Sequence, residues 1–488
     1  MATNGDFQEK RWLALILLCS AQFVVVLDAS IVNVALPSIG DALDFSQANL
    51  PWVVNAYVLT FGGFLLLGGR TADLLGRRRV FMAGLMLVAV ASLVAGFAAT
   101  EGQLIAARAA QGLGAAIISP AALSIVTTTF SDGAERNKAL GVWGAVAGSG
   151  GAAGVLLGGI LTDGLGWEWV LWVNVPVSLI ALALAPRLIA ESRAEHETRA
   201  FDVAGAVTVT AALSILVYAL VDATDAGWGS AQTLGLIGLS VALLAAFVAI
   251  ELRATKPLVP FSIFRIRTLT GANVVGLLVG ASLFSMFFFI SLYMQQVLGY
   301  SAIHAGLSYL PLALVIMASA GIASQLVTKL GYKPVLAAGL MFIVIGLVWF
   351  SRVSVGGGFT TDILGPSLFA AAGLGFAFVT TTIAAVSGVE EKEAGLASGL
   401  INTSQQIGGA LGLAVLSTIA TTHTEDLIAS GDPNSLDALN EGFQAAFLGG
   451  AGIALLGFVL TLVLIRGSDS RAHVELGKQE AATESASA

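Results

Sequence analysis

Two charged residues stand inside long apolar stretches of the sequence. Asp28 falls within the apolar run from Trp12 to Leu36, and Arg108 falls within the run 103–129. An ionised side chain in such a run is costly unless it faces a cavity or an oppositely charged partner. Burial raises the pKa of a carboxyl group and a nearby cation lowers it, so a carboxylate whose surroundings change can bind and release a proton. Asp28 is therefore a candidate proton carrier.

Asp28 and Arg108 are placed to meet. Asp28 lies roughly 12 Å from the expected outer end of its helix, and Arg108 lies about 8 Å from the outer end of another, at 1.5 Å per residue. The long arginine side chain can cover this difference in depth, which predicts an ion pair. A structural interpretation is open for both: Asp28 could cap the helix end or line a water site, and the pair could only fix helix packing. We favour proton coupling.

A second charged cluster follows the apolar run 50–70. It reads Gly69-Arg-Thr-Ala-Asp73-Leu-Leu-Gly76-Arg77-Arg78-Arg79. Asp73 could accept hydrogen bonds from the amino terminus of a neighbouring helix, whose dipole favours an anion, and so latch an outward-facing state. A basic loop at the inner membrane face would explain the arginines, but neither Asp73 nor the glycine spacing. We therefore predict a gating loop made of Gly69, Asp73, Gly76, Arg77 and Arg78.

The elements that position these residues are predicted to be membrane helices. Of the 488 residues, 56% are hydrophobic and 11% are charged, whereas a soluble domain carries about a quarter charged residues. Mean hydropathy is +0.87. Apolar windows long enough to span a bilayer fall near 12–36, 50–70, 80–99, 103–129, 139–162, 169–188, 203–222, 232–252, 270–297, 304–327, 335–352, 364–388, 395–421 and 443–465. We read the first as an uncleaved helix, because no small-residue cleavage site interrupts it.

Charge placement supports this set of fourteen spans. If the amino terminus is cytoplasmic, 21 of the 23 basic residues fall in inner loops or at inner helix ends, and the exceptions are Arg108 and Arg352. If a helix were missed, every later loop would be assigned to the wrong side of the membrane. The positive-inside rule therefore tests the number of spans. The even count places both termini in the cytoplasm.

Three short motifs recur in the same order in the second half. Asp73-Leu-Leu-Gly76 corresponds to Thr328-Lys-Leu-Gly331, and Gly112-Leu-Gly114 to Gly373-Leu-Gly375; Gly150-Gly-Ala-Ala-Gly154 corresponds to Gly408-Gly-Ala-Leu-Gly412. Offsets of 255 to 261 residues join helices of like orientation, which indicates parallel repeats with a binding site near the bilayer midplane. We predict an all-α membrane protein with segments 1–11 (cytoplasmic), 12–190 (six-helix bundle), 203–252 (inserted helix pair), 270–465 (six-helix bundle) and 466–488 (disordered cytoplasmic tail).

The gating loop resembles the signature loop of the major facilitator superfamily. Leu27-Asp28-Ala-Ser-Ile-Val-Asn33-Val-Ala-Leu-Pro37 is similar to the first-helix motif of its fourteen-helix drug:proton antiporters, and Arg108-Ala-Ala-Gln111-Gly112 to their fourth-helix motif. Further similarities are Trp167-Glu-Trp169 through Asn174-Val-Pro176, and Gly395 through Gly409, including Asn402 and Gln405. The resemblance runs from about residue 12 to 465, and it implies proton coupling by Asp28 and Arg108.

Two positions depart from the antiporter pattern. Val155 replaces a proline of the helix-five motif, and Leu74 replaces a basic residue of the inner loop. The first affects a helix kink and the second a gate contact. Glycines recurring mostly every fourth residue nevertheless give helix five a smooth packing ridge, which includes Gly150, Gly154, Gly158 and Gly159.

Candidate substrate contacts are polar, aromatic and Met-rich. Adaptable aromatic and methionine surfaces suit varied amphipathic ligands, although many such side chains will face lipid. We predict a substrate cavity lined by Asn33, Asn55, Tyr57, Gln111, Phe288, Gln295, Gln296, Asn402 and Gln405.

Several functional classes lack their signatures. The sequence has no Gly-x-x-x-x-Gly-Lys-Ser/Thr phosphate loop, its four histidines are scattered, and its single cysteine, Cys19, excludes an intramolecular disulfide. Repeated pore-lining motifs are missing as well. We therefore expect neither an enzyme nor a channel, with no cofactor, metal or nucleic-acid partner.

The combined prediction is a monomeric transporter in the bacterial inner membrane. Its partners are a small molecule, protons and the lipid bilayer. By alternating access it would exchange protons for small amphipathic compounds such as drugs or antibiotics. A proton-coupled importer on the same fold and a membrane sensor or scaffold that does not transport are the alternatives.

Overall fold

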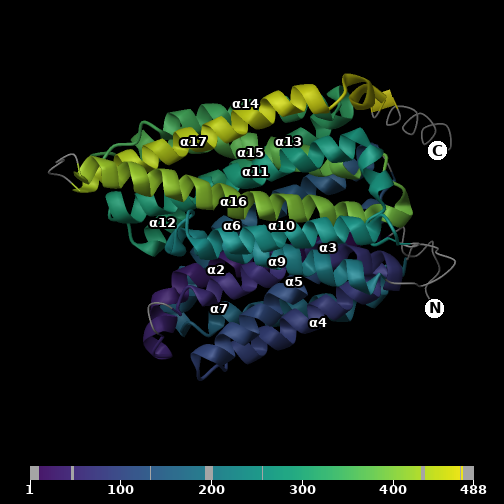
Figure 1. The fold of residues 1–488 in the computed structure, drawn as a ribbon, viewed down its shortest axis with the longest axis horizontal. Helices are drawn as coiled ribbons and strands as arrows, with labels where there is room; N and C mark the ends of the chain where they lie inside the picture. The colour runs from purple at the N-terminus through teal and green to yellow at the C-terminus, as the bar shows by residue number, and fades with distance from the viewer. Residues whose placement is uncertain are drawn as a thin grey trace. The chain divides into compact units, whose positions relative to one another are not determined.

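The computed structural model describes residues 10–45, 49–131, 133–192, 202–254, 257–429, 435–472 and 474–475, and the regular structure in these ranges is helical (Figure 1). In a bilayer every backbone N–H and C=O group needs a partner within the protein, and a helix satisfies these groups inside one segment. Long apolar runs therefore fold as helices. The helices form two compact units.

Unit 1 comprises the described residues of 1–131, 153–266 and 388–403. Its helices are α2 (Arg11–Ala42), α3 (Trp52–Leu75), α4 (Arg77–Ala95), α5 (Glu101–Thr129), α7 (Trp169–Trp172), α8 (Asn174–Leu188), α9 (Val203–Ala226), α10 (Ala231–Glu251) and the short η1 (Phe261–Arg265). It also contains the second segment of α6 (Ala134–Leu165) and the start of α16 (Ala394–Ala429), which follows η4 (Glu391–Glu393). Asp28, Arg108 and Asp73 all belong to this unit.

Unit 2 comprises the described residues of 132–152, 267–387 and 404–488. Its helices are α11 (Arg267–Leu292), η2 (Tyr293–Val297), α12 (Ala302–Ser308), α13 (Leu310–Leu330), α14 (Tyr332–Phe350), η3 (Phe359–Ile363), α15 (Leu364–Val386) and α17 (Ser435–Leu464). The first segment of α6 and most of α16 complete it. Among these elements, η2 and η3 are π-helical.

The number of spans agrees with the sequence prediction. Thirteen helices in the described part of the chain are long and apolar enough to cross a membrane, and α6 makes a fourteenth if Ala134–Gly151 and Ala153–Leu165 are one span. These two segments meet at an angle of 43°. Gly150 and Gly151 immediately precede the junction, and small-residue pairs of this kind are a known cause of helix kinks. The bend therefore occurs without a proline at Val155.

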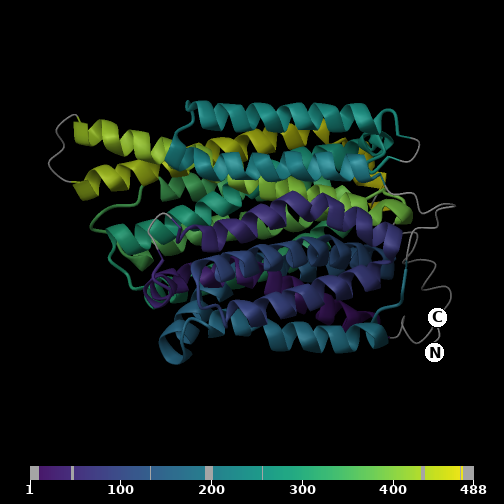
Figure 2. The ribbon, with the colours of Figure 1, turned by 60° about the horizontal axis from the view of Figure 1, so that its bottom comes forward.

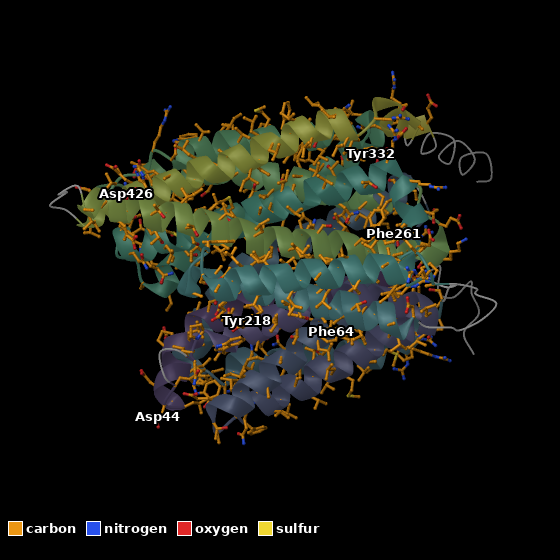
Figure 3. All side chains as sticks on the ribbon, in the orientation of Figure 1. Asp44, Phe64, Tyr218, Phe261, Tyr332 and Asp426 are labelled. Carbon is orange, nitrogen blue, oxygen red and sulfur yellow. The ribbon has the colours of Figure 1, made fainter. Side chains whose placement is uncertain are left out.

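Side chains on the helix surfaces fit a lipid environment. Large apolar residues stay exposed along the helices, such as Ile16 at 61%, Val90 at 51% and Val463 at 69%. Figure 3 shows carbon along the helices, with oxygen and nitrogen atoms most frequent toward the helix ends. Exposed apolar surface of this extent indicates contact with membrane or another apolar partner.

Two segments differ from their predicted limits. The first helix was expected to end at Leu36, but α2 continues to Ala42 with Pro37 inside it. The sequence predicts a disordered tail at 466–488; within its described part, residues 467–472 are helical, and Ser470 Oγ accepts the backbone N–H of Lys333 at 3.1 Å. The predicted segment 1–11 up to residue 9, residue 473 and the tail from residue 476 lie outside the described residues.

Close glycine packing sets α5 against α3. A Cβ added at Gly112 would lie 2.3 Å from the Tyr57 carbonyl oxygen, and one at Gly68 would lie 2.2 Å from the Ala116 carbonyl oxygen. Any side chain at these positions would push the helices apart. Gly112 follows Arg108 by one helical turn. The close approach at Gly112 therefore also brings Arg108 into contact with α3, at the Val53 carbonyl oxygen.

The helices α9 and α10, which the sequence predicts to be an inserted pair, pack within unit 1 and run side by side (Figure 2). Ser240 Oγ donates to the Ala212 carbonyl oxygen at 2.8 Å, which joins α10 to α9. The α9 helix then packs on α3: the Tyr218 ring stacks on Trp52 with centroids 5.7 Å apart, and Gly63 leaves room for Ser214. The pair thus borders the helix that carries Asp73.

Candidate functional site

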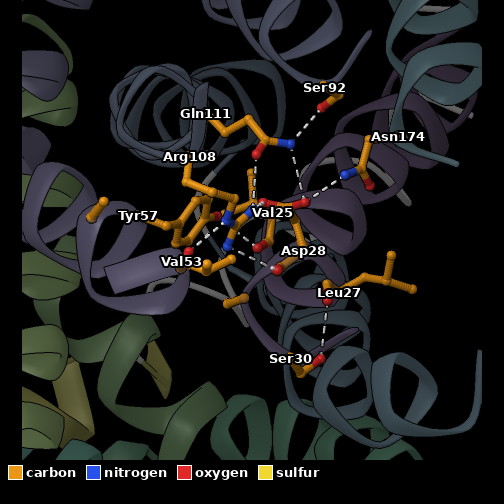
Figure 4. A network of polar contacts seen from close by, with 12 residues as sticks. Val25, Leu27, Asp28, Ser30, Val53, Tyr57, Ser92, Arg108, Gln111 and Asn174 are labelled. Carbon is orange, nitrogen blue, oxygen red and sulfur yellow. Dashed lines mark hydrogen bonds and ion pairs between the residues drawn. The ribbon is translucent and has the colours of Figure 1, made fainter. Parts of the chain in front are cut away.

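Asp28 lies near the middle of α2, fourteen residues before its last residue, Ala42. At 1.5 Å per residue this is about 21 Å from the helix end, deeper than the sequence predicted. The side chain is buried, with 2% exposed. Figure 4 shows the donors that converge on its carboxylate. Arg108 Nη1 lies 2.5 Å from Oδ2, while Gln111 Nε2 and Asn174 Nδ2 lie 3.3 Å and 2.5 Å from Oδ1.

Arg108 is fully buried and contacts two helices besides its own α5, namely α2 and α3. Its Nε donates to the Val53 carbonyl oxygen at 2.9 Å, and Nη1 also donates to Gln111 Oε1 at 2.9 Å. The guanidinium carbon lies 4.5 Å from the centre of the Tyr57 ring, within range of a cation–π interaction. These contacts hold the cation beside Asp28 and confirm the predicted ion pair.

The pair is chemically suited to proton exchange. Removing either partner from a buried ion pair leaves an uncompensated charge at a cost of about 3–5 kcal/mol. Neutralising Asp28 by a proton would likewise weaken its attraction to Arg108. In the described ranges, no group of three or more His, Cys, Asp or Glu residues could hold a metal ion.

Two residues predicted to line the substrate cavity lie in the same network. Gln111 is buried and also donates to Ser92 Oγ at 2.7 Å. Tyr57 is buried and donates its hydroxyl to the Val25 carbonyl oxygen at 2.9 Å. Both side chains therefore contact the ion pair and are themselves held in place, Gln111 by Ser92 on α4 and Tyr57 by Val25 on α2.

The other predicted cavity residues are dispersed. Asn33 is exposed on α2, where Nδ2 donates to the Ala29 carbonyl oxygen at 3.4 Å, and Asn55 is half-buried on α3. Asn402 accepts from Ser119 Oγ at 3.3 Å within unit 1. In unit 2, Gln405 is buried with Nε2 unpartnered, whereas Phe288, Gln295 and Gln296 are exposed on α11 and η2.

Sequence reasoning missed Asn174 as a site residue. It is the first residue of α8 and is fully buried. A sequence signal exists, since Asn174 stands in the largely apolar stretch 169–176 of a motif that resembles the family. Ser92, a buried serine in the last turn of α4, carries no such signal.

In the predicted gating loop, Asp73 makes the contact with a helix amino terminus that the sequence predicted. Asp73 is fully buried, and its two carboxylate oxygens each lie 3.0 Å from a backbone N–H at the start of α16, those of Gly395 and Leu396. Arg77 donates to Asp73 Oδ1 through Nη2 at 2.8 Å. A carboxylate at a helix amino terminus satisfies unpaired N–H groups and the helix dipole together.

The two loop glycines have different tasks. A Cβ at Gly69 would lie 2.4 Å from the Gly395 carbonyl oxygen, so glycine allows α3 to approach α16. Gly76 ends α3 with φ of +108°, a conformation that other residues rarely adopt. This turn brings Arg78 to Glu191, whose carboxylate accepts the Arg78 backbone N–H at 3.2 Å.

The predicted glycine ridge of α6 packs beside Asp28. A Cβ at Gly154 would lie 1.9 Å from Ser30 Oγ and 3.0 Å from the Leu27 carbonyl oxygen, and one at Gly158 would lie 2.7 Å from the Ile31 carbonyl oxygen. Gly150 and Gly159 are buried as well. Gly154 and Gly158 therefore permit the close α2–α6 contact on one side of the carboxylate.

Membrane-spanning helices and an ion pair buried among the helices of unit 1 are the features of a multi-pass membrane protein. The family model of the Major Facilitator Superfamily matches residues 18–413. The chain belongs to this superfamily, whose members are transporters of small molecules.

Individual relatives cover nearly the whole chain. The cephamycin export protein CmcT of Amycolatopsis lactamdurans is 41% identical over 454 residues, covering 92% of each chain. The puromycin resistance protein pur8 of Streptomyces alboniger is 38% identical over 468 residues, covering 95% of this chain and 92% of its own. A solved structure of the proton:xylose symporter XylE has a TM-score of 0.66 at 12% identity, covering 95% of this chain and 97% of XylE, which shows the shared fold.

Proposed function

We propose that this chain exports small amphipathic compounds of the antibiotic type in exchange for protons, by alternating access. The observation that carries the proposal is the buried Asp28–Arg108 pair, 2.5 Å apart and enclosed by Gln111, Asn174 and Tyr57. A carboxylate held in this way is a proton site whose affinity depends on its neighbours. Relatives named for cephamycin export and puromycin resistance support the direction of transport and the kind of cargo.

In the proposed cycle, Asp28 is ionised and paired with Arg108 while the substrate is taken up from the cytoplasm. A proton entering from outside neutralises Asp28, weakens the ion pair and favours release of the substrate. Asp73 stabilises one of the alternating states by capping α16, and breaking its bonds to Gly395 and Leu396 accompanies the opposite state. The proposal places the protein in a bacterial inner membrane as a monomer, with both termini cytoplasmic.

The proposal is tested in proteoliposomes containing the purified protein and a pH-sensitive dye, with puromycin and a cephamycin as probes. Movement of protons opposite to the probe supports an antiporter. Movement of protons in the same direction as the probe would instead identify an importer. If neither probe causes proton movement, a sensor or scaffold is favoured. Empty liposomes given the same probes provide the background.

A further inference from the structure

Of the two polar side-chain atoms of Asn174, one has a hydrogen-bond partner among the described residues and the other has none. Its Nδ2 donates to Asp28 Oδ1 at 2.5 Å, while its Oδ1 is buried without a hydrogen-bond partner among the described residues. In Figure 4 the amide nitrogen points at the carboxylate and the amide oxygen points away from it. A buried acceptor without a partner costs about 1–3 kcal/mol, so its presence beside the central charge calls for an explanation.

A proton on Asp28 would need an acceptor, and the other neighbours offer little. Arg108 has donors only. Gln111 Oε1 already accepts from Arg108 Nη1 at 2.9 Å, and the Tyr57 hydroxyl donates to the Val25 carbonyl oxygen. The Asn174 amide is planar and nearly symmetric in shape, so half a turn about its last bond exchanges nitrogen for oxygen at the carboxyl group.

We propose that Asn174 is a positioning residue that supplies Asp28 with a partner in both protonation states. Its Nδ2 donates to the ionised carboxylate, and after rotation its Oδ1 accepts the proton of the carboxylic acid. The oxygen Oδ1 then lacks a partner while Asp28 is ionised and accepts a hydrogen bond only when Asp28 is protonated. This inference rests on the proposed function, in which Asp28 carries the transported proton.

The surroundings of Asp28 leave few other groups to titrate. The elements packed against α2 present Arg108 from α5 and Tyr57 from α3 as the charged and titratable groups facing the carboxylate. The second segment of α6 presents Gly154 and Gly158, α7 presents apolar residues, and α8 presents Asn174. A pH-dependent change at this position is therefore assignable to Asp28.

The test uses purified protein in detergent and pH-difference infrared spectroscopy, which needs no substrate. The carboxyl carbonyl band that is lost in Asp28→Asn belongs to Asp28, and its midpoint is measured in Asn174→Leu and Asn174→Ser. Ser178→Ala is the matched control, because Ser178 is buried one turn further along α8 and its Oγ is also unpartnered. A charge-assisted hydrogen bond is stronger than a neutral one, so leucine weakens the ionised state more than the protonated state.

The midpoint should therefore rise by about one pH unit, or about tenfold in proton affinity, in Asn174→Leu. It should rise less in Asn174→Ser, whose hydroxyl can donate and accept, and stay unchanged in Ser178→Ala. The side-chain amide signal that shifts with the same midpoint in the wild type should lose its Asn174 component in Asn174→Leu, whereas the component from Gln111, which also donates to Asp28, remains. An unchanged midpoint in Asn174→Leu, an equal rise in Ser178→Ala, or an amide band insensitive to pH would overturn the inference. If Asp28→Asn removes no titrating band, the proposed function itself fails.

Discussion

At the scale of single residues, the central feature is a carboxylate with three donors and no water-facing surface. Asp28 is bonded to Arg108, Gln111 and Asn174 at distances between 2.5 and 3.3 Å. A buried ion pair is weak evidence for stability, because desolvation offsets attraction. Its presence here is better explained by a function that needs a charge inside the membrane.

Removing only the cation should destabilise the protein. In Arg108→Ala, Asp28 keeps its burial but loses its charged partner, so we expect a loss of about 3–5 kcal/mol, measured as a lower melting temperature in detergent. The double variant Asp28→Asn with Arg108→Gln removes both charges and should recover much of that loss. Equal melting temperatures for Arg108→Ala and the wild type would mean that the pair contributes nothing to the free energy of unfolding.

Residue types alone predicted the pair but not its full surroundings. The opposite charges of Asp28 and Arg108 inside apolar runs predict a pair, since isolated charges in such runs need partners, whereas the depth of Asp28 was underestimated because α2 continues to Ala42. Gln111 and Tyr57 were assigned to a substrate cavity and Asn174 to no role, because polar residues in membrane helices do not reveal in sequence which direction they face. Only helix packing decides that.

At the scale of helices, two contacts control where the charged residues sit. Asp73 caps the first turn of α16, and Gly154 lets α6 approach α2 beside Asp28. Hydropathy located these helices well, but it placed the end of α2 at Leu36 rather than Ala42, because the last turns are polar and contain Pro37. A helix can continue through a proline when neighbouring groups satisfy the freed carbonyl.

The cap on α16 should depend on the charge of Asp73. In Asp73→Asn, the side chain keeps its shape but accepts the Gly395 and Leu396 N–H groups less well and loses its pairing with Arg77. We expect a loss of about 1–2 kcal/mol locally, seen as roughly tenfold faster hydrogen exchange at these two amides.

A matched control for the cap is available in the same unit. Asp202 caps α9 by accepting the Gly205 N–H at 2.8 Å. Asp202→Asn should therefore speed exchange at Gly205 and leave the start of α16 protected. Unchanged protection at Gly395 in Asp73→Asn would contradict the capping role.

The α2–α6 contact should tolerate no side chain. In Gly154→Ala, the new methyl group would collide with Ser30 Oγ and press on the Leu27 carbonyl oxygen, which overpacks the contact by about 1–3 kcal/mol. Gly164→Ala on the same helix meets no atom within 4 Å and should be neutral or slightly stabilising. The measurement is the melting temperature of each variant, and the reverse order would disprove the packing argument.

At the scale of the whole molecule, fold class and number of spans were predictable from composition, hydropathy and charge placement. The three repeated motifs likewise predicted parallel repeats, and superfamily membership agrees with that architecture. The sequence predicts a helix pair at 203–252, but not its packing on α3, which depends on individual contacts such as Trp52 with Tyr218. Substrate identity is a property of scattered side chains, and no pattern in the sequence specifies it.

The most direct test of the account measures puromycin transport driven by an imposed pH gradient in proteoliposomes, comparing wild type with Asp28→Asn at matched amounts of folded protein. Asp426→Asn, at an exposed carboxylate of α16, is the control and should transport normally. We predict gradient-driven accumulation by the wild type and none above empty liposomes for Asp28→Asn, because asparagine can neither bind nor release the coupling proton. Accumulation by Asp28→Asn equal to that of the wild type would contradict the account.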